Sequence, residues 1–202
     1  YPIVHTTDDE KYLTTDFNGQ QAWGATYGSI FLSAANTGDF SDPNNIVYGH
    51  HLNNGSMFAC FADFADQATF DEHRTIYLLT PQGNYRLTTF SLMHVDENDP
   101  LAQTRFTDDA ARVEYVQDKI DRSVVKADGI AAASDMGRTF AFATCDNVVS
   151  SKRYVLFASV TESTADASAD PDAVQAVGEA AAETTGEAVG EASSDDAGEA
   201  AA

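Results

Sequence analysis

The sequence is poor in cysteine and has no long hydrophobic run. Its 202 residues include only two cysteines, Cys60 and Cys145, which is too few for a domain stapled by disulfides. No Cys/His cluster has the spacing of a zinc site, and the acidic residues lack the spacing of a calcium loop. We therefore expect no metal and no cofactor. No apolar run reaches the roughly 18 residues of a membrane-spanning helix, and no signal-peptide pattern is present.

Positive charge is also scarce. Eleven Lys and Arg residues face 32 Asp and Glu residues, which gives a formal net charge of -21. Such a surface repels phosphate backbones, so a nucleic-acid partner is excluded. It also argues against docking on an anionic membrane through basic patches. We expect contact with a membrane only through an N-terminal anchor that precedes Tyr1.

Two regions of different composition follow one another. Residues 1–161 contain all the aromatic residues, and 43% of the whole chain is hydrophobic, enough for one sizeable core. From 162 to 202 the chain is rich in Ala, Glu, Asp and Gly, and Gly-Glu-Ala recurs at Gly178, Gly186, Gly190 and Gly198. Such a segment buries too little apolar surface to offset its ordering entropy. We predict a catalytic or binding domain over 1–161 and a disordered acidic tail over 162–202, with a plain spacer as its simplest role.

The first region reads as mainly β. Segments rich in β-branched and aromatic residues are bounded by Gly, Pro, Asn or Asp. Pro81-Gln82-Gly83-Asn84 between two of them predicts a hairpin. The predicted strands are Ser29–Leu32, Ile46–Gly49, Thr75–Leu79, Tyr85–Val95, Thr139–Cys145 and Tyr154–Val160.

Two helices are predicted between the strands. One runs from Ser56, as its cap, to about Asp66, with an apolar face of Met57, Cys60, Phe61 and Phe64. The other runs from about Thr107, as its cap, to Val124, with a stripe of Ala110, Val113, Val116 beside Tyr115, and Ile120. Strands before, between and after such helices favour a closed barrel with helical insertions over alternating βαβ units.

Cys145 and Arg153 flank a polar stretch that joins two predicted strands. A thiol acts as a nucleophile when it is accessible and when positive charge stabilises its thiolate. If the polar stretch is a loop, Arg153 lies beside Cys145 and can stabilise an oxyanion. Taken singly, Cys145 is better explained as a buried structural cysteine and Arg153 as a surface cation.

His50 ends another predicted strand, directly after Tyr48-Gly49. A histidine beside a cysteine can act as general acid and base, although an isolated histidine is more often structural. His51 is a rival for this role. Consecutive residues of an extended segment point to opposite sides, so we expect one of the two to face Cys145, and we favour His50.

These segments together resemble the class B sortases. The resemblance rests on Tyr48-Gly49-His50, the following Gly55-Ser-Met-Phe58, Thr144-Cys145 and Arg153 eight residues later. Gly28–Phe31 and Asn44–Val47 resemble the first strands of that family, and Tyr1–Val4 resembles their entry. The resemblance covers about Tyr1 to Val160.

The resemblance implies a mainly β fold, a sortase-type closed barrel of about eight strands with helical insertions. It implies Cys145 as nucleophile, His50 as general acid and base, Arg153 as stabiliser of the transition state, and Thr144 as a substrate-binding residue beside the thiol. Ala143 stands where the family often has serine, so any hydrogen bond from that serine is lost.

The implied enzyme is a cysteine transpeptidase on the extracellular face of the cell membrane. It cleaves a C-terminal sorting signal after Thr through a thioacyl intermediate. It then joins the protein to an amine of a peptidoglycan precursor or of a pilin lysine. A hydrolytic cysteine peptidase and a non-catalytic surface-binding barrel are the alternatives. We further expect Cys60 to face the core and to form no disulfide with Cys145.

Overall fold

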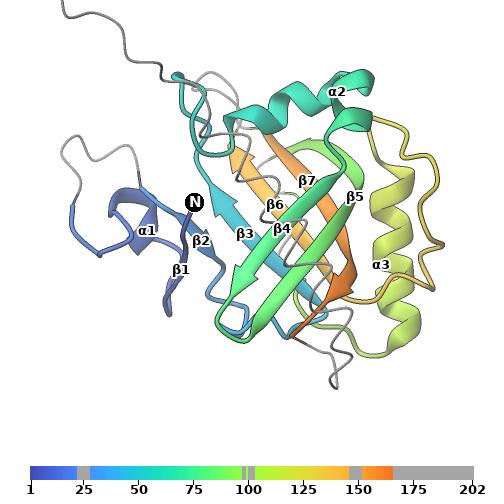
Figure 1. Ribbon diagram of the computed structural model, residues 1–202, viewed down its shortest axis with the longest axis horizontal. Helices are drawn as coiled ribbons and strands as arrows, with labels where there is room; N and C mark the ends of the chain where they lie inside the picture. Colours follow the sequence, from blue (N-terminus) through green and yellow to red (C-terminus); the bar gives the residue numbers. More distant parts are fainter. Residues whose placement is uncertain (22–27, 97–98, 100–102, 146–151, 166–202) are drawn as a thin grey trace, which may run out of the picture.

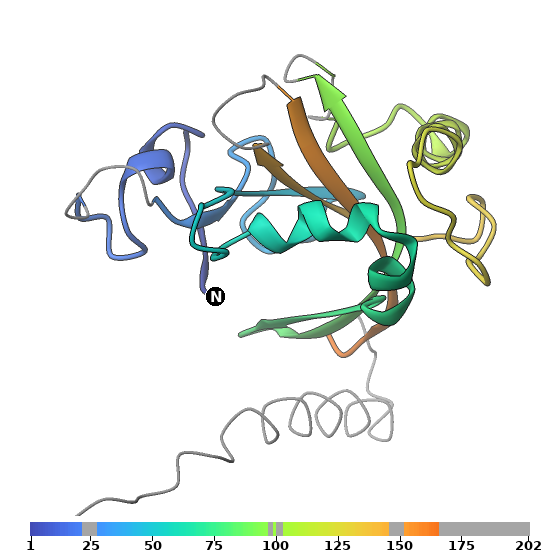
Figure 2. The same ribbon diagram turned by 90° about the horizontal axis from the view of Figure 1, so that it is seen from above.

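The computed structural model describes residues 1–21, 28–96, 99, 103–145 and 152–165. Seven strands in this part of the chain form one sheet in the order β1-β2-β3-β6-β7-β5-β4. The sheet curls into a half-barrel, with helices packed on both of its faces (Figures 1 and 2). The prediction of a mainly β, sortase-type fold with helical insertions is confirmed, but the described strands form a seven-stranded half-barrel and not the closed barrel of about eight strands (Figure 2).

The strands lie close to the predicted segments. Their bounds are β1 Ile3–His5, β2 Ile30–Leu32, β3 Asn44–Gly49, β4 Thr75–Thr80, β5 Gly83–Asp96, β6 Thr139–Cys145 and β7 Lys152–Ser163. Strands β1 and β2, and strands β3 and β6, are parallel neighbours, whereas the other neighbouring pairs are antiparallel. Strands β4 and β5 form the predicted hairpin, in which Thr80 pairs with Gly83 across Pro81 and Gln82.

Alternate residues of the central strands supply two cores. Phe140 and Phe142 of β6 join a cluster that contains Phe61, Phe64 and Phe70. The next residues along the same strand, Ala141 and Ala143, join a second cluster on the opposite face, which contains Tyr115 and Val116 of helix α3 (Asp109–Asp121). A strand buried on both faces has no polar alternation, which is why β6 reads as a nearly continuous apolar run.

The predicted helix Ser56–Asp66 is wrong in type and bounds. The chain forms a 3₁₀-helix, η1 (Ala59–Ala65), followed by an α-helix, α2 (Gln67–Glu72), whose N-terminus is capped by the Asp66 side chain. Three residues complete one turn of a 3₁₀-helix, so Phe58, Phe61 and Phe64 fall on one buried side. These phenylalanines are three residues apart, a spacing that indicates a 3₁₀-helix and that a search for an α-helical period misses.

The second helix matches its prediction more closely. Asp108 rather than Thr107 caps helix α3, because its carboxylate accepts a hydrogen bond of 2.9 Å from the backbone N–H of Ala111. The helix packs against the outer face of the sheet through Tyr115 and Val116 (Figure 2). Ala110, which we expected in the apolar stripe, is exposed. A short helix, α1 (Lys11–Thr14), lies near the start of the chain.

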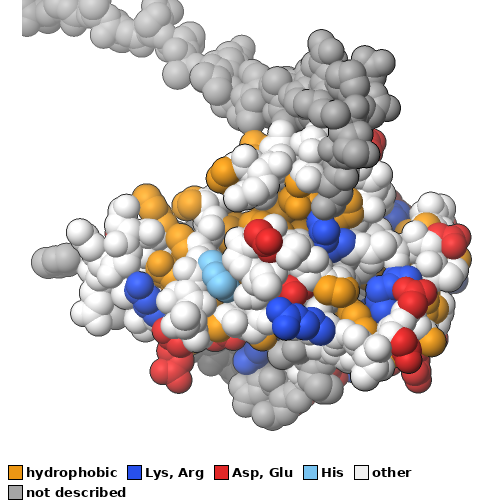
Figure 3. All heavy atoms as spheres, turned by 90° about the horizontal axis from the view of Figure 1, so that it is seen from below, with side chains coloured by type: hydrophobic (Ala, Val, Ile, Leu, Met, Phe, Trp, Pro, Cys, Tyr) orange, Lys and Arg blue, Asp and Glu red, His pale blue; other side chains and the backbone are white. Residues whose placement is uncertain are grey.

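Charges of both signs are spread over the surface. On the face shown in Figure 3, the Lys and Arg side chains of the described residues are interspersed with Asp and Glu and do not merge into one basic patch. Within the described residues, no helix is both long and apolar enough to cross a membrane.

Strand β7 continues beyond the predicted domain boundary at 161. Ser163 pairs with Tyr85, and Arg86 Nη1 lies 2.6 Å from the Glu162 carboxylate. The backbone N–H of Thr164 donates to the Asn84 carbonyl at 2.9 Å, and Ala165 packs against the core. Residues 162–165 therefore belong to the folded domain. The remainder of the predicted tail lies outside the described residues.

These contacts predict different results for two truncations. A chain that ends at Ala165 should match the full chain within about 0.5 kcal/mol of unfolding free energy, as for surface changes that remove no packing. A chain that ends at Thr161 should lose about 1–3 kcal/mol, because it loses the pairing with Tyr85 and Asn84. Urea denaturation of the three chains tests this. Equal stability of all three would show that residues 162–165 contribute nothing.

Candidate active site

The predicted catalytic residues come from three neighbouring strands. Strands β3 and β6 run parallel, with Gly49 opposite Thr144, so the segments that carry His50 and Cys145 end at the same edge of the sheet. Strand β7 runs back from this edge, and Arg153 is the backbone partner of Cys145. The fold therefore brings His50 together with Cys145 and Arg153, from which it is distant in the sequence.

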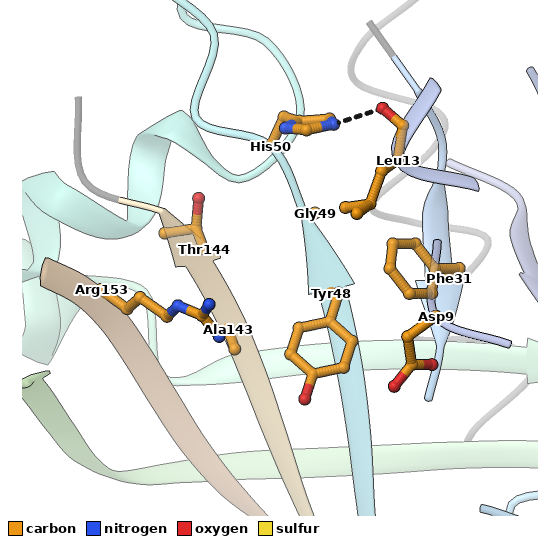
Figure 4. A pocket seen from close by; sticks show the side chains of 9 residues that line it. All are labelled: Asp9, Leu13, Phe31, Tyr48, Gly49, His50, Ala143, Thr144 and Arg153. Atoms are coloured by element: carbon orange, nitrogen blue, oxygen red, sulfur yellow. Dashed lines mark hydrogen bonds between the residues drawn. The ribbon is translucent and has the colours of Figure 1, made fainter. Parts of the chain in front are cut away.

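A pocket of about 210 Å³ opens at this edge (Figure 4). Its apolar walls come from Leu13, Phe31, Ala143 and the ring of Tyr48. Its other lining residues are Asp9, Gly49, His50, Thr144 and Arg153. Three of the four predicted site residues thus line one pocket. The backbone of Cys145 ends β6 beside it, and the Cys145 side chain lies outside the described part of the structure.

His50 is half-buried and oriented by the start of the chain. Its Nε2 atom lies 2.9 Å from the carbonyl oxygen of Leu13. Because a carbonyl oxygen only accepts hydrogen bonds, Nε2 must carry the proton. In the neutral ring, Nδ1 is then the basic nitrogen. The arrangement leaves that nitrogen available for proton transfer while Nε2 fixes the plane of the ring.

His51 is placed differently. It forms an isolated β-bridge with Met57 across the loop that leads into η1, and its Nδ1 atom is buried without a partner in the described residues. It is not one of the residues that line the pocket. The geometry therefore agrees with the preference for His50 as the functional histidine.

Position 49 needs a glycine because the Phe58 side chain leaves no space for a Cβ atom, and not because of its backbone angles. A Cβ atom at this position would lie 2.7 Å from Cδ2 of Phe58. The Phe58 ring is held in turn by Phe61, with ring centroids 4.6 Å apart, and by Phe142 at 6.1 Å. A side chain at position 49 would have to displace this packed ring or shift the strand that ends at His50.

We therefore predict that Gly49→Ala lowers both stability and activity. The expected loss of unfolding free energy is about 1–3 kcal/mol, the usual cost of overpacking a core. Gly137→Ala is the matched control, because a Cβ there meets no atom within 4 Å. Denaturant unfolding and peptide turnover of both variants give the comparison. Unchanged behaviour of Gly49→Ala would mean that Phe58 has room to move.

Arg153 offers a guanidinium group to the pocket. The residue is half-buried, and its Nε atom is buried without a hydrogen-bond partner among the described residues. Its side chain reaches past Ala143 toward the same space as Tyr48 and His50 (Figure 4). A guanidinium that no carboxylate of the described residues neutralises keeps its donors for a ligand oxygen.

Asp9 and Tyr48 form a polar wall that sequence reasoning missed. The Asp9 carboxylate accepts hydrogen bonds from Ser33 Oγ at 2.9 Å and from the backbone N–H of Ala34 at 2.6 Å. Burial raises the pKa of Tyr48, the Asp9 charge raises it further, and Arg153 and a hydrogen bond with Ser33 lower it. Tyr48 therefore stays a neutral phenol between two opposite charges. No spacing in the sequence linked Asp9 to this site.

Thr144, predicted to bind substrate, lines the pocket but is only 1% exposed. Little of its surface is accessible to a ligand in the pocket, so Thr144 chiefly shapes the pocket wall next to Cys145. No group of three or more His, Cys, Asp or Glu side chains in the described residues is arranged to hold a metal ion.

The prediction that Cys60 faces the core is wrong. Cys60 is a free and exposed thiol on η1, because the 3₁₀ turn puts Phe58, Phe61 and Phe64 on the buried side instead. Burial of part of the side chain raises the pKa of the Cys60 thiol, and the Asp63 carboxylate adds to this. At neutral pH Cys60 is therefore a weak nucleophile.

The exposure of Cys60 changes what its substitution should do. We expect Cys60→Ala to alter the unfolding free energy by less than about 0.5 kcal/mol, the range of surface substitutions, and to leave activity intact. Thiol titration in denaturant without reductant should count two free thiols in the unmodified protein. A count of zero, with activity appearing only after reduction, would mean that the two cysteines pair.

Comparison with known proteins finds two relatives of the same name. No family model matches the chain. Sortase B of Staphylococcus aureus is 27% identical over 162 residues, which cover 79% of this chain and 64% of that protein. Sortase B of Listeria monocytogenes is 29% identical over 146 residues, which cover 72% of this chain and 57% of that protein. The chain thus spans about three fifths of the length of these relatives.

Solved structures agree with the sequence comparison. The sortase B structure of Clostridium perfringens superposes with a TM-score of 0.73 at 26% identity and covers 80% of this chain and 87% of that one. The S. aureus sortase B–substrate complex has a TM-score of 0.70 at 27% identity, with 79% of this chain and 73% of that one covered. In both fold and sequence the chain is thus similar to sortases.

The relatives given above are class B sortases. The curated relatives carry the name sortase B, and the solved structures given above are sortase B structures. The resemblance to the class B sortases, inferred from the motifs around His50, Cys145 and Arg153, is confirmed.

Proposed function

We propose that this chain is the catalytic domain of a cysteine transpeptidase that cleaves a C-terminal sorting signal after Thr and transfers the acyl group to an amine. The observation that carries the proposal is the meeting of His50, Cys145 and Arg153 at one edge of the sheet, beside a pocket. The relatives support the proposal, since sortase B of S. aureus has been solved with a substrate and a sortase B has been solved with triglycine.

The proposed reaction begins with acylation. The Cys145 thiolate attacks the carbonyl carbon of the scissile Thr, and the electron pair of that carbonyl moves onto its oxygen. Arg153, whose Nε atom has no hydrogen-bond partner among the described residues, stabilises this oxyanion through its guanidinium group. As the tetrahedral species collapses, the C–N bond breaks and protonated His50 gives a proton to the leaving amine. A thioester to Cys145 remains.

The second half releases the enzyme. An amine attacks the thioester carbonyl, His50 takes a proton from the attacking nitrogen, and the Cys145 thiolate leaves. The proposed amine belongs to a peptidoglycan precursor or to a pilin lysine. The proposed location is the extracellular face of the cell membrane, with an anchor in the full-length protein. Water in place of the amine would make the enzyme a hydrolytic cysteine peptidase.

Product analysis tests the proposal. The protein is incubated with a library of sorting-signal peptides, with and without an added amine, and the products are identified by mass spectrometry. An amide joining the acyl fragment to the amine supports a transpeptidase. Free acid that persists at saturating amine supports a peptidase instead. Absence of any acylated protein with every peptide would refute both, and Cys145→Ala serves as the blank.

A further inference from the structure

The pocket beside His50 contains a negative charge that the proposed reaction does not use. Asp9 is half-buried, whereas its neighbours Asp8 and Glu10 are exposed. Its carboxylate oxygens accept hydrogen bonds from Ser33 Oγ and from the backbone N–H of Ala34. Both donors are neutral, and Asp9 forms no ion pair with any described residue. Its negative charge therefore remains available to a ligand.

The fixed position of this charge makes it suited to recognition. Two hydrogen bonds to neighbouring groups of one short segment hold the carboxylate in one orientation, so little freedom is lost when a ligand binds. Figure 4 places Asp9 on the side of the pocket opposite Arg153, with the phenol of Tyr48 between them. The pocket thus has a cationic end near the reacting edge and an anionic end away from it.

The walls between the two ends are apolar. Leu13 and Phe31 lie on the Asp9 side of the pocket, and the ring of Tyr48 lies between its two ends (Figure 4). Phe31 is buried, and its ring packs against that of Tyr48 with centroids 5.4 Å apart. Apolar walls that lead to a carboxylate match a side chain with a long apolar stem and a cationic tip, because such side chains bury the stem and pair the tip.

We propose that Asp9 is a specificity residue that selects a sorting signal carrying a lysine or arginine at one position upstream of the scissile Thr. The stem of this side chain packs on Leu13, Phe31 and Tyr48, and its charged tip pairs with Asp9. A glutamate at the same position meets the Asp9 charge and is rejected. This inference rests on the proposed function, since it concerns the acyl donor of that reaction.

The test compares matched peptides. A sorting-signal peptide is scanned with Lys, Gln and Glu at each position upstream of Thr, and kcat/KM for thioacyl formation is measured. In the unmodified protein, one position should favour Lys over Glu by about 10- to 100-fold, the scale of a hydrogen bond to a charged group. Asp9→Asn keeps an acceptor for Ala34 and should abolish most of that preference.

Controls separate a local from a general effect of charge. Glu10→Gln removes one exposed negative charge next to Asp9 and should keep the preference for Lys. Thermal unfolding confirms that Asp9→Asn is folded. Should that variant not fold, the unmodified protein decides the question. Its Lys-over-Glu ratio must fall as ionic strength rises, because salt screens the pairing of charges.

Three results would overturn the proposal. The preference could be absent from the unmodified protein although peptides are acylated, or it could persist in Asp9→Asn. The effect of Asp9→Asn could also be confined to the KM of the amine, which would assign Asp9 to the acyl acceptor. Each leaves the transpeptidase proposal intact, whereas a complete lack of acylation would refute both.

Discussion

Cys145→Ala should form no thioacyl species, and His50→Ala and Arg153→Ala should each slow its formation by at least about a hundredfold. The reason differs for each residue. Removal of the thiol removes the nucleophile itself. Loss of His50 removes the proton donor to the leaving amine, and loss of Arg153 removes an oxyanion donor; each such group is worth about two or more powers of ten. Steady-state kinetics with a fluorogenic sorting peptide measures all three.

Two further variants make this experiment specific. Arg153→Lys keeps the charge but loses the planar arrangement of donors, so it should restore little of the rate. His51→Ala, which changes the neighbouring ring outside the pocket, should retain most of the turnover. Near-normal turnover by Arg153→Ala would remove that residue from the mechanism, and a loss in His51→Ala equal to that in His50→Ala would reopen the choice between the two histidines.

Asp42→Ala should lower the unfolding free energy by about 3 kcal/mol. The Asp42 side chain is 4% exposed. It accepts hydrogen bonds from Asn36 Nδ2, from the backbone N–H and hydroxyl of Thr37 and from Arg105 Nε, at 2.6 to 3.2 Å. Hydrogen bonds to a charged group contribute about 1.5–3 kcal/mol, and the buried donors would be left unsatisfied. Asp135→Ala, at an exposed position, is the control and should be nearly neutral.

The same carboxylate should make stability depend on pH. Burial by itself raises the pKa of Asp42, but the donors of Asn36, Thr37 and Arg105 outweigh burial, and the net pKa lies below its usual value. The stabilisation is therefore complete above the unfolded-state pKa of about 3.9 and is lost as pH falls through the lower, folded-state pKa. Denaturation at a series of pH values should show a flatter acid limb for Asp42→Asn than for the unmodified protein. Parallel limbs would contradict this.

The sequence predicts the strands of this fold better than its helices. β-branched and aromatic runs located β6 to the residue, because a central strand packed on both faces needs such side chains along its whole length. The region around η1 escaped this reasoning. Phe58, Phe61 and Phe64 recur every third residue, and a search for an α-helical period placed Cys60 on the buried side, where the structure does not have it.

Some residues of the site could be predicted from the sequence and others could not. The resemblance carried by Gly49-His50, Thr144-Cys145 and Arg153 predicted one shared site, whereas each residue taken singly did not. Asp9 and Leu13 were not predictable in this way. Asp9 lies in the loop before α1 and contacts Ser33, and Leu13 lies in α1 and contacts His50. No periodic pattern encodes such contacts.

The parallel pairing of β3 with β6 also has a consequence for how the protein acquires its activity. Parallel neighbours need a long crossover between them, and here the intervening chain includes β4, β5 and helix α3. Contacts between residues so distant in sequence form slowly, because the chain loses the entropy of loop closure before these contacts stabilise it. His50 therefore meets Cys145 and Arg153 only after β6 and β7 have been inserted between β3 and β5. Partly folded copies should accordingly be inert toward peptides.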